Sequence, residues 1–146
     1  MRKKRIQTIF LSSVLLFSTM GTALAASKSR RTECIWLHSK ASVTGTYTNA
    51  MIRDSFSYTM TVMGMDSDLK NSGTSVHIEW AAYGYGYIGF RYKLLKDGSN
   101  KLEKNGTISS SKGFSTNSCY VCVKLSYMDV GGNTIRSSYK EAWLDK

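Results

Sequence analysis

The sequence predicts an all-β fold: an antiparallel β-sandwich of about seven strands, Ig-like or jelly-roll-like, with a small barrel as the alternative. Three observations carry this prediction. Apolar and polar residues alternate with period two along most of the chain after residue 25, and no long amphipathic helical pattern interrupts them. The alternating segments contain threonine, tyrosine and valine, which suit a pleated surface. Glycine-containing turn signals separate the segments.

The first 25 residues have the form of an export signal. Residues 2–5 (RKKR) are a positive cluster, residues 9–17 are an apolar run, and residues 23–25 (ALA) offer small side chains to a signal peptidase. Ser, Thr and Gly interrupt the apolar region, which is shorter than the ~20 residues that a membrane span needs. We therefore expect cleavage after Ala25, secretion, and no stable membrane insertion of the mature chain.

The expected mature chain, residues 26–146, has the size of one all-β domain. The whole chain has 20 basic and 10 acidic residues, and four of the basic ones lie in residues 2–5, so the mature chain carries 16 − 10 = +6. This excess favours anionic surroundings such as cell-envelope polymers. We do not expect nucleic acid as a partner, because the basic residues are scattered and the chain is exported.

Three segments after the signal have one apolar and one polar face, as expected for strands of antiparallel sheets. Their residues expected in the core are Ala41, Val43, Gly45 and Tyr47; Phe56, Tyr58, Met60 and Val62; and Cys119, Val121, Val123, Leu125 and Tyr127. The residues between these positions, among them Tyr120, Cys122 and Lys124, are expected to face outward.

Residues 75–95 predict a hairpin. One continuous strand of this length would run roughly 65 Å, whereas a compact domain of this size is only about 35 Å across. Gly84 and Gly86 favour a turn, and the apolar residues are even-numbered on both sides, which requires a loop centred on Tyr85. The resulting pairs are Val76–Leu94, Ile78–Tyr92, Trp80–Phe90 and Ala82–Ile88 in the core, with Glu79–Arg91, His77–Lys93 and Tyr83–Tyr87 outside.

Further turns are expected at Asp97-Gly98, at Asn105-Gly106 and around Gly131. The last of these would pair a strand ending at Tyr127 with one beginning at Ile135. The Ser, Lys and Gly residues that follow Ile108 are expected to form a loop.

The three cysteines of an exported chain predict one disulfide and one remaining thiol. Cys119 and Cys122 are three residues apart on one expected strand, so their side chains face opposite sides and cannot bridge. If the first strand runs unbroken, Cys34 has the outward parity of Cys122, which favours a Cys34–Cys122 disulfide. The apolar run at residues 35–37 blurs this parity and leaves Cys34–Cys119 as the alternative.

The sequence offers weak support for catalysis or for a metal. His77, Glu79, Cys119 and Cys122 share the H-x-E…C-x-x-C outline of zinc-dependent nucleobase deaminases, but Ser118 stands where those enzymes have proline. The two cysteines would also lie on opposite faces of a strand, out of reach of one ion. We therefore expect no metal and no cofactor.

Other candidate groups also have ordinary structural explanations. Asp66-Ser67-Asp68 lacks the later ligands of a calcium loop, so a polar turn is expected there. His38 and His77 are the only histidines, and histidines among apolar strand residues are more often structural than catalytic.

The expected tip of the hairpin is the candidate binding site. Tyr83, Tyr85 and Tyr87, near Arg91, offer flat rings that stack on sugars, lipid headgroups or a partner protein; alternatively, the rings only cover the backbone of the flanking glycines. We expect a secreted, cationic, non-enzymatic protein that binds an extracellular protein, a glycan or an anionic envelope polymer. The alternatives are an antibacterial protein that acts on envelopes and a secreted hydrolase that uses His38 or His77.

Overall fold

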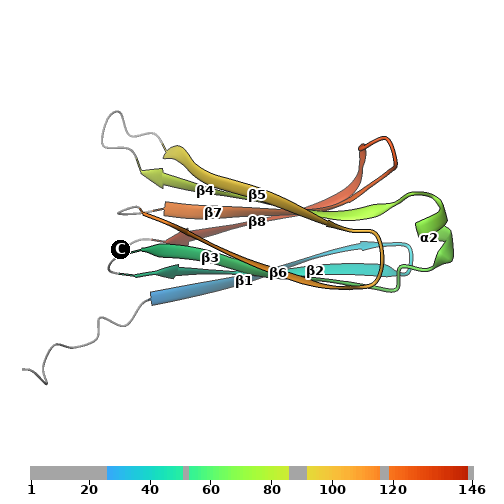
Figure 1. The fold of residues 1–146 in the computed structure, drawn as a ribbon, viewed down its shortest axis with the longest axis horizontal. Helices are drawn as coiled ribbons and strands as arrows, with labels where there is room; N and C mark the ends of the chain where they lie inside the picture. Colours follow the sequence, from blue (N-terminus) through green and yellow to red (C-terminus); the bar gives the residue numbers. More distant parts are fainter. Residues whose placement is uncertain (1–25, 51–52, 86–91, 116–118, 145–146) are drawn as a thin grey trace, which may run out of the picture.

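The computed structural model describes residues 26–50, 53–85, 92–115 and 119–144, and these form a β-sandwich (Figure 1). Two antiparallel four-stranded sheets have the orders β1-β2-β3-β6 and β5-β4-β7-β8. The strands are β1 (Ala26–Trp36), β2 (Ser39–Asn49), β3 (Asp54–Met63), β4 (Ser75–Tyr85), β5 (Tyr92–Leu102), β6 (Gly106–Phe114), β7 (Cys119–Met128) and β8 (Thr134–Leu144). A short helix, α2 (Ser67–Asn71), connects β3 to β4. The predicted all-β sandwich is confirmed.

The core lies between the two sheets and contains the residues that the alternating pattern predicts. All the predicted core residues of β2, β3 and β7 are buried. Trp80 of β4 packs against Phe56 of β3 with ring centroids 5.2 Å apart, so an aromatic contact connects the two facing sheets. At the other end of the core, the Tyr127 hydroxyl hydrogen-bonds to Ser39 Oγ at 2.8 Å.

The hairpin between β4 and β5 forms, but the predicted register is wrong. Val76 pairs with Leu102 and Trp80 with Gly98, eight residues further along than predicted in each case. The predicted turn residues Gly84 and Tyr85 lie within β4, and the connection falls in residues 86–91, outside the described part of the chain. The predicted pairs of Val76, Ile78 and His77 with Leu94, Tyr92 and Lys93 do not form.

Strand length explains this difference. Each of the two strands has 11 residues, or roughly 36 Å, which spans a compact domain of this size. The chain therefore turns later than the first glycine. Gly84 serves packing instead, because a Cβ atom there would lie 2.7 Å from the side chain of Leu95. Leu95 is the extra residue of a β-bulge, and the even-with-even parity holds up to that bulge.

Two other predicted irregular regions are also strands. Asp97-Gly98 lies inside β5, where the missing side chain of Gly98 makes room for the Trp80 indole. The residues after Ile108 form most of β6, which pairs with β3 and is held partly by hydroxyl contacts such as Thr59 Oγ1 to Ser109 Oγ at 3.0 Å. Short polar side chains thus form an edge strand here.

The remaining turn predictions are confirmed. Asn105-Gly106 ends the connection from β5 to β6, and Asn105 Oδ1 accepts a hydrogen bond from the Met65 amide at 2.8 Å. The hairpin of β7 and β8 turns through residues 129–133, where Asp129 Oδ1 accepts from the Asn133 amide at 2.8 Å. Gly132 has φ 79°, the left-handed conformation that glycine tolerates.

The three cysteines form no disulfide, and the parity that favoured Cys34–Cys122 is wrong. A tight turn at residues 37–38 reverses the chain and pairs Cys34 with Ala41, so Cys34 faces the core, whereas Cys122 is partly exposed on the outer face of the other sheet. The alternative Cys34–Cys119 fails on distance. Cys119 contacts Tyr47, which lies roughly 20 Å along β2 from Ala41.

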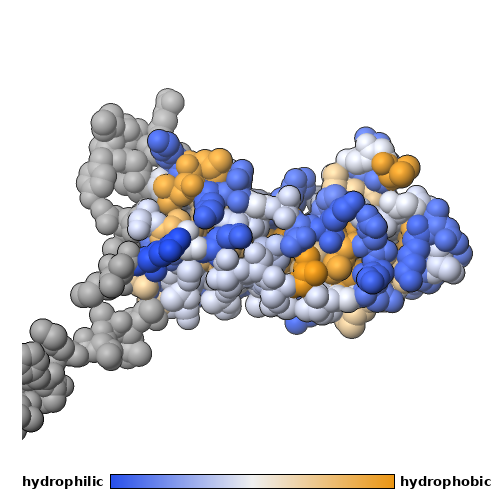
Figure 2. Space-filling model, in the orientation of Figure 1, coloured by the Kyte–Doolittle hydropathy of each residue, from blue (hydrophilic) through white to orange (hydrophobic). Residues whose placement is uncertain are grey.

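The surface in view is largely polar, with a few apolar areas (Figure 2). Apolar surface gathers where β5 begins and at the turn after β7, which match the exposed residues Leu94, Leu95 and Val130. The described part of the chain contains no helix that is long and apolar enough to cross a bilayer.

Candidate functional site

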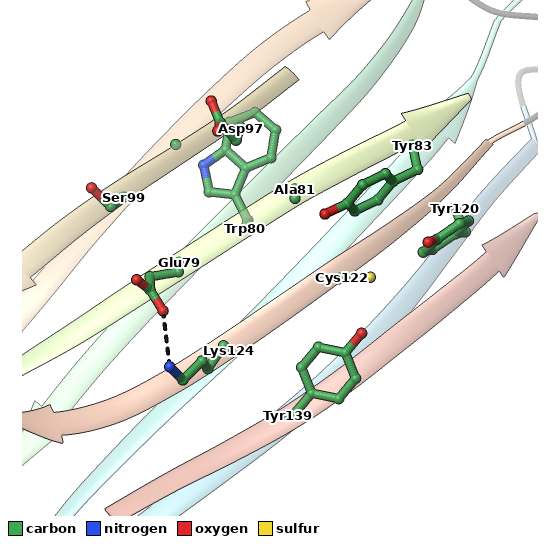
Figure 3. Close-up of a pocket in the computed structure, with 11 residues that line it drawn as sticks. Glu79, Trp80, Ala81, Tyr83, Asp97, Ser99, Tyr120, Cys122, Lys124 and Tyr139 are labelled. Atoms are coloured by element: carbon green, nitrogen blue, oxygen red, sulfur yellow. Dashed lines mark ion pairs between the residues drawn. The ribbon is translucent and has the colours of Figure 1, made fainter. Parts of the chain in front are cut away.

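A groove with a volume of about 550 Å³ lies on the outer face of the β5-β4-β7-β8 sheet (Figure 3). Because side chains alternate along a strand, each strand contributes every second residue to this face. The outward-facing residues that line the groove are Glu79, Ala81 and Tyr83 of β4, Asp97 and Ser99 of β5, Tyr120, Cys122 and Lys124 of β7, and Tyr139 of β8. Trp80 and Gly98 complete the lining.

Strand register arranges these residues in three rows across the sheet. From β5 towards β8 the rows are Ser99–Glu79–Lys124–Tyr139, then Asp97–Ala81–Cys122–Glu141, then Leu94–Tyr83–Tyr120–Trp143. Neighbouring rows are roughly 7 Å apart along the strands. Among the outward-facing lining residues of the two central strands, Ala81 and Cys122 have the smallest side chains, so they form the floor of the groove.

A stacked pair of tyrosines forms one end of the groove. Tyr83 and Tyr120 are cross-strand neighbours whose ring centroids are 5.1 Å apart and whose planes differ by only 15°. Both side chains are half-buried, and stacking restricts the rotation of each ring. Leu94, paired with Tyr83 on the β5 side, extends this end as an exposed apolar rim.

The opposite end of the groove is charged. Lys124 Nζ lies 3.3 Å from Glu79 Oε2, and both side chains remain about half exposed, so this ion pair contributes little to stability. Tyr139, 51% exposed, stands beside Lys124 and points its hydroxyl toward Cys122 (Figure 3). Asp97 adds a second carboxylate on the β5 side. The described lining residues therefore carry two carboxylates and one ammonium, a net charge opposite in sign to that of the chain.

Of the four predicted binding residues, Tyr83 lies in the groove. Its neighbours are Tyr120 and Leu94 rather than the predicted Tyr87. Tyr85 is the last residue of β4. Tyr87 and Arg91 lie outside the described residues, so their predicted role at the hairpin tip stays a prediction.

The sequence analysis missed Tyr120 and Tyr139 as site residues. The period-two pattern of β7 does place Tyr120, Cys122 and Lys124 on an outward face, and the structure confirms this. The pattern does not indicate which strand lies beside β7. The pairing of β4 with β7 joins residues about 40 positions apart, such as Tyr83 and Tyr120, and no local signal specifies it.

Neither histidine is among the residues that line the groove. His38 forms an ion pair with Asp66, whose Oδ1 caps α2 by accepting from the Leu69 amide at 3.1 Å, so the acidic turn is a helix cap. His77 Nε2 hydrogen-bonds to Ser75 Oγ at 2.7 Å. Burial lowers the pKa of His77, and the nearby Lys101 ammonium lowers it further.

The two cysteines of the C-x-x-C outline are separated as a strand requires. Cys119 is buried in the core, and burial raises the pKa of its thiol to about 11. Cys122 lies on the opposite side of the strand, on the floor of the groove. The two sulfur atoms therefore do not face a common site.

Comparison with known proteins adds no family to this geometry. The chain matches no protein-family model, and a search of curated proteins finds no match either.

Proposed function

We propose that this protein is an exported, non-enzymatic binding protein that contacts an extracellular or cell-envelope partner through the tyrosine groove. The observation that carries the proposal is the stacked Tyr83–Tyr120 pair beside a floor of small side chains. Such a site has two properties that binding needs, namely aromatic surface held in place before the ligand arrives and space next to it.

The dimensions of the groove support this function. Its volume of about 550 Å³ lies within the ~300–1,000 Å³ that ligand sites occupy. Tyrosine provides a large, rigid and amphipathic contact at low cost in conformational entropy. Because Tyr83 and Tyr120 already stack on each other, the ligand need not order them, and this preorganisation favours affinity.

The predicted export and positive charge support the same proposal. A cationic chain is concentrated near anionic cell surfaces by long-range attraction, which weakens as salt rises. Arg30 and Arg31 lie on β1, in the other sheet, so they can contribute to this attraction without contacting a ligand in the groove. The charge would bring the protein to an envelope, and the groove would select what it holds there.

The test is retention of the purified protein on bacterial cell-wall fragments, immobilised extracellular proteins and a glycan array. We expect Tyr83→Ala to weaken binding of the preferred partner by about tenfold or more, since the change removes one ring of the preformed pair. The matched control is Thr44→Ala, on the exposed outer face of the opposite sheet. Equal retention of the two variants on every partner that binds would overturn the proposal.

A further inference from the structure

We infer that the groove takes an uncharged carbohydrate, a chain of pyranose rings, rather than an anionic polymer or a peptide. This inference rests on the proposed function and deepens it by naming the chemical class of the ligand. Three properties of the groove carry it: an apolar aromatic end, a mixed set of hydrogen-bonding groups, and a position centred on the two inner strands of the sheet.

The aromatic end suits the faces of sugar rings. A pyranose presents C–H groups on its faces and hydroxyls around its edge, so it stacks its face on an aromatic ring and leaves its edge for hydrogen bonds. The row Leu94–Tyr83–Tyr120 provides the apolar surface, because Leu94 is 46% exposed and the two tyrosine side chains, stacked on each other, are each only partly buried.

The polar groups suit the edges of sugar rings. A sugar hydroxyl both donates and accepts, and the groove offers partners of each kind. The Asp97 and Glu79 carboxylates accept, the Lys124 ammonium donates, and the Ser99 and Tyr139 hydroxyls do both. Hydrogen bonds from neutral hydroxyls to a carboxylate are among the stronger ones, which makes Asp97 a useful anchor.

The charge of the groove disfavours a phosphate, sulfate or uronate polymer. Among the described lining residues the one cation is Lys124, which already pairs with Glu79 at 3.3 Å and leaves the carboxylate of Asp97 to repel an anion. The positive charge of the whole chain favours anionic surroundings in general, but the groove itself does not.

The position of the groove disfavours an extended peptide. A peptide that binds to a sheet gains main-chain hydrogen bonds by adding to an edge strand. The groove lies over β4 and β7, and each of these strands is already paired on both sides. A peptide across this face would bury amide groups without such partners, at a cost in free energy. Sugar rings carry no backbone amides that need a sheet edge.

The length of the groove predicts how many sugar units it contacts. The row of Glu79 and the row of Tyr83 are four residues apart on β4, or roughly 13 Å. This span accommodates two linked pyranose rings end to end. The groove is a shallow, open depression, so a longer chain can continue past it. We therefore expect oligosaccharides to bind more tightly than the corresponding monosaccharides.

The test is isothermal titration calorimetry of the purified protein with four uncharged oligosaccharides: cellohexaose, chitohexaose, maltohexaose and mannohexaose. Hyaluronan and an inorganic polyphosphate are the anionic comparisons. We expect at least one uncharged oligosaccharide to bind, with an affinity that changes less than about threefold between 50 and 500 mM NaCl because no ion pair forms. Tyr83→Ala should weaken it about tenfold or more and Asp97→Asn by several-fold.

Two controls separate lost contacts from lost folding. Tyr83→Phe keeps the ring and should retain most of the affinity, and Thr44→Ala on the other sheet should leave it unchanged. Asp97→Asn also distinguishes the ligand classes by the direction in which the affinity changes. Removing this carboxylate weakens the binding of a sugar but strengthens the binding of an anion.

Each remaining outcome identifies what is wrong. Absence of binding by all four uncharged oligosaccharides overturns the carbohydrate inference. Binding of only the anionic polymers, strengthened by Asp97→Asn and weakened by Tyr83→Ala, overturns the ligand class but leaves the groove as a binding site. An uncharged oligosaccharide that binds all variants alike overturns the groove itself, and with it the proposed function.

Discussion

Replacing Gly98 by alanine tests the packing that holds the β5 wall of the groove in place. A Cβ atom at Gly98 would lie 2.6 Å from Trp80 Nε1 and 2.9 Å from two further indole carbons. Trp80 is only 4% exposed and packs on Phe56, with ring centroids 5.2 Å apart, so the indole has little room to move. Either the indole shifts into the core or β5 moves away from β4.

The size of the effect follows from two opposing contributions. Overpacking of a filled core costs about 1–3 kcal/mol. Glycine to alanine within a strand would otherwise stabilise by roughly 0.5–1 kcal/mol, because the unfolded chain loses freedom. We therefore expect Gly98→Ala to lower the free energy of unfolding by about 1–2 kcal/mol. Asp97 and Ser99 flank Gly98 on the groove wall, so ligand affinity should fall as well.

The assay is equilibrium unfolding in urea, monitored by tryptophan fluorescence. The matched control is Gly131→Ala, where the new Cβ atom meets only the side-chain ends of Asn133 and Asp129 at 3.2 and 3.3 Å. Trp80→Phe should cost less stability in the Gly98→Ala background than in the wild type, because the smaller ring relieves the clash. A Gly98→Ala variant at least as stable as the wild type would refute the reasoning.

Three further predictions concern charge and reactivity. Burial lowers the pKa of His77, so at acidic pH the folded state binds fewer protons than the unfolded state. The free energy of unfolding should therefore fall as the pH drops below about 6.5. His77→Gln should flatten this pH dependence, as urea titrations at pH 5 and 7.5 would show. Asp66 accepts the capping hydrogen bond of α2, so Asp66→Ala should lower the melting temperature more than Asp66→Asn, which keeps a capping oxygen; equal losses would contradict the cap. With iodoacetamide at pH 8, the native protein should react at Cys122 on the groove floor well before it reacts at Cys119, which is buried and whose pKa is raised to about 11. Peptide mass mapping would show the order of labelling. Equally fast labelling of the two thiols would contradict this assignment.

The pattern of buried and exposed positions was predictable because it depends on local alternation. Residues two apart on a strand share a face, so Phe56, Met60 and Val123 could be placed in the core without knowing which strands are neighbours. The same rule placed Tyr120 and Cys122 outside. Polar edge strands lack this signal, and so β6, with its consecutive serines, was interpreted as loop.

Register and strand order could not be obtained in this way. Parity alone permits several registers of the β4–β5 hairpin, because a shift of two residues leaves every side chain on the same face. The glycines at 84 and 86 indicated a turn earlier in the chain than the one that forms. Gly84 and Gly98 are required instead by the side chains of Leu95 and Trp80 that lie against them. Contacts of this kind exist only after the strands have paired. The groove depends on them too, because Tyr83 meets Tyr120 only when β7 lies beside β4.

The central claim is that the outer face of the β5-β4-β7-β8 sheet binds an uncharged oligosaccharide. Its most direct test is a ¹H–¹⁵N NMR titration with the oligosaccharide that binds most tightly in calorimetry. We predict that the largest amide shifts map to Ala81, Tyr83, Tyr120 and Cys122 along the groove. Shifts confined to the β1-β2-β3-β6 sheet, or spread evenly over the molecule, would contradict the claim.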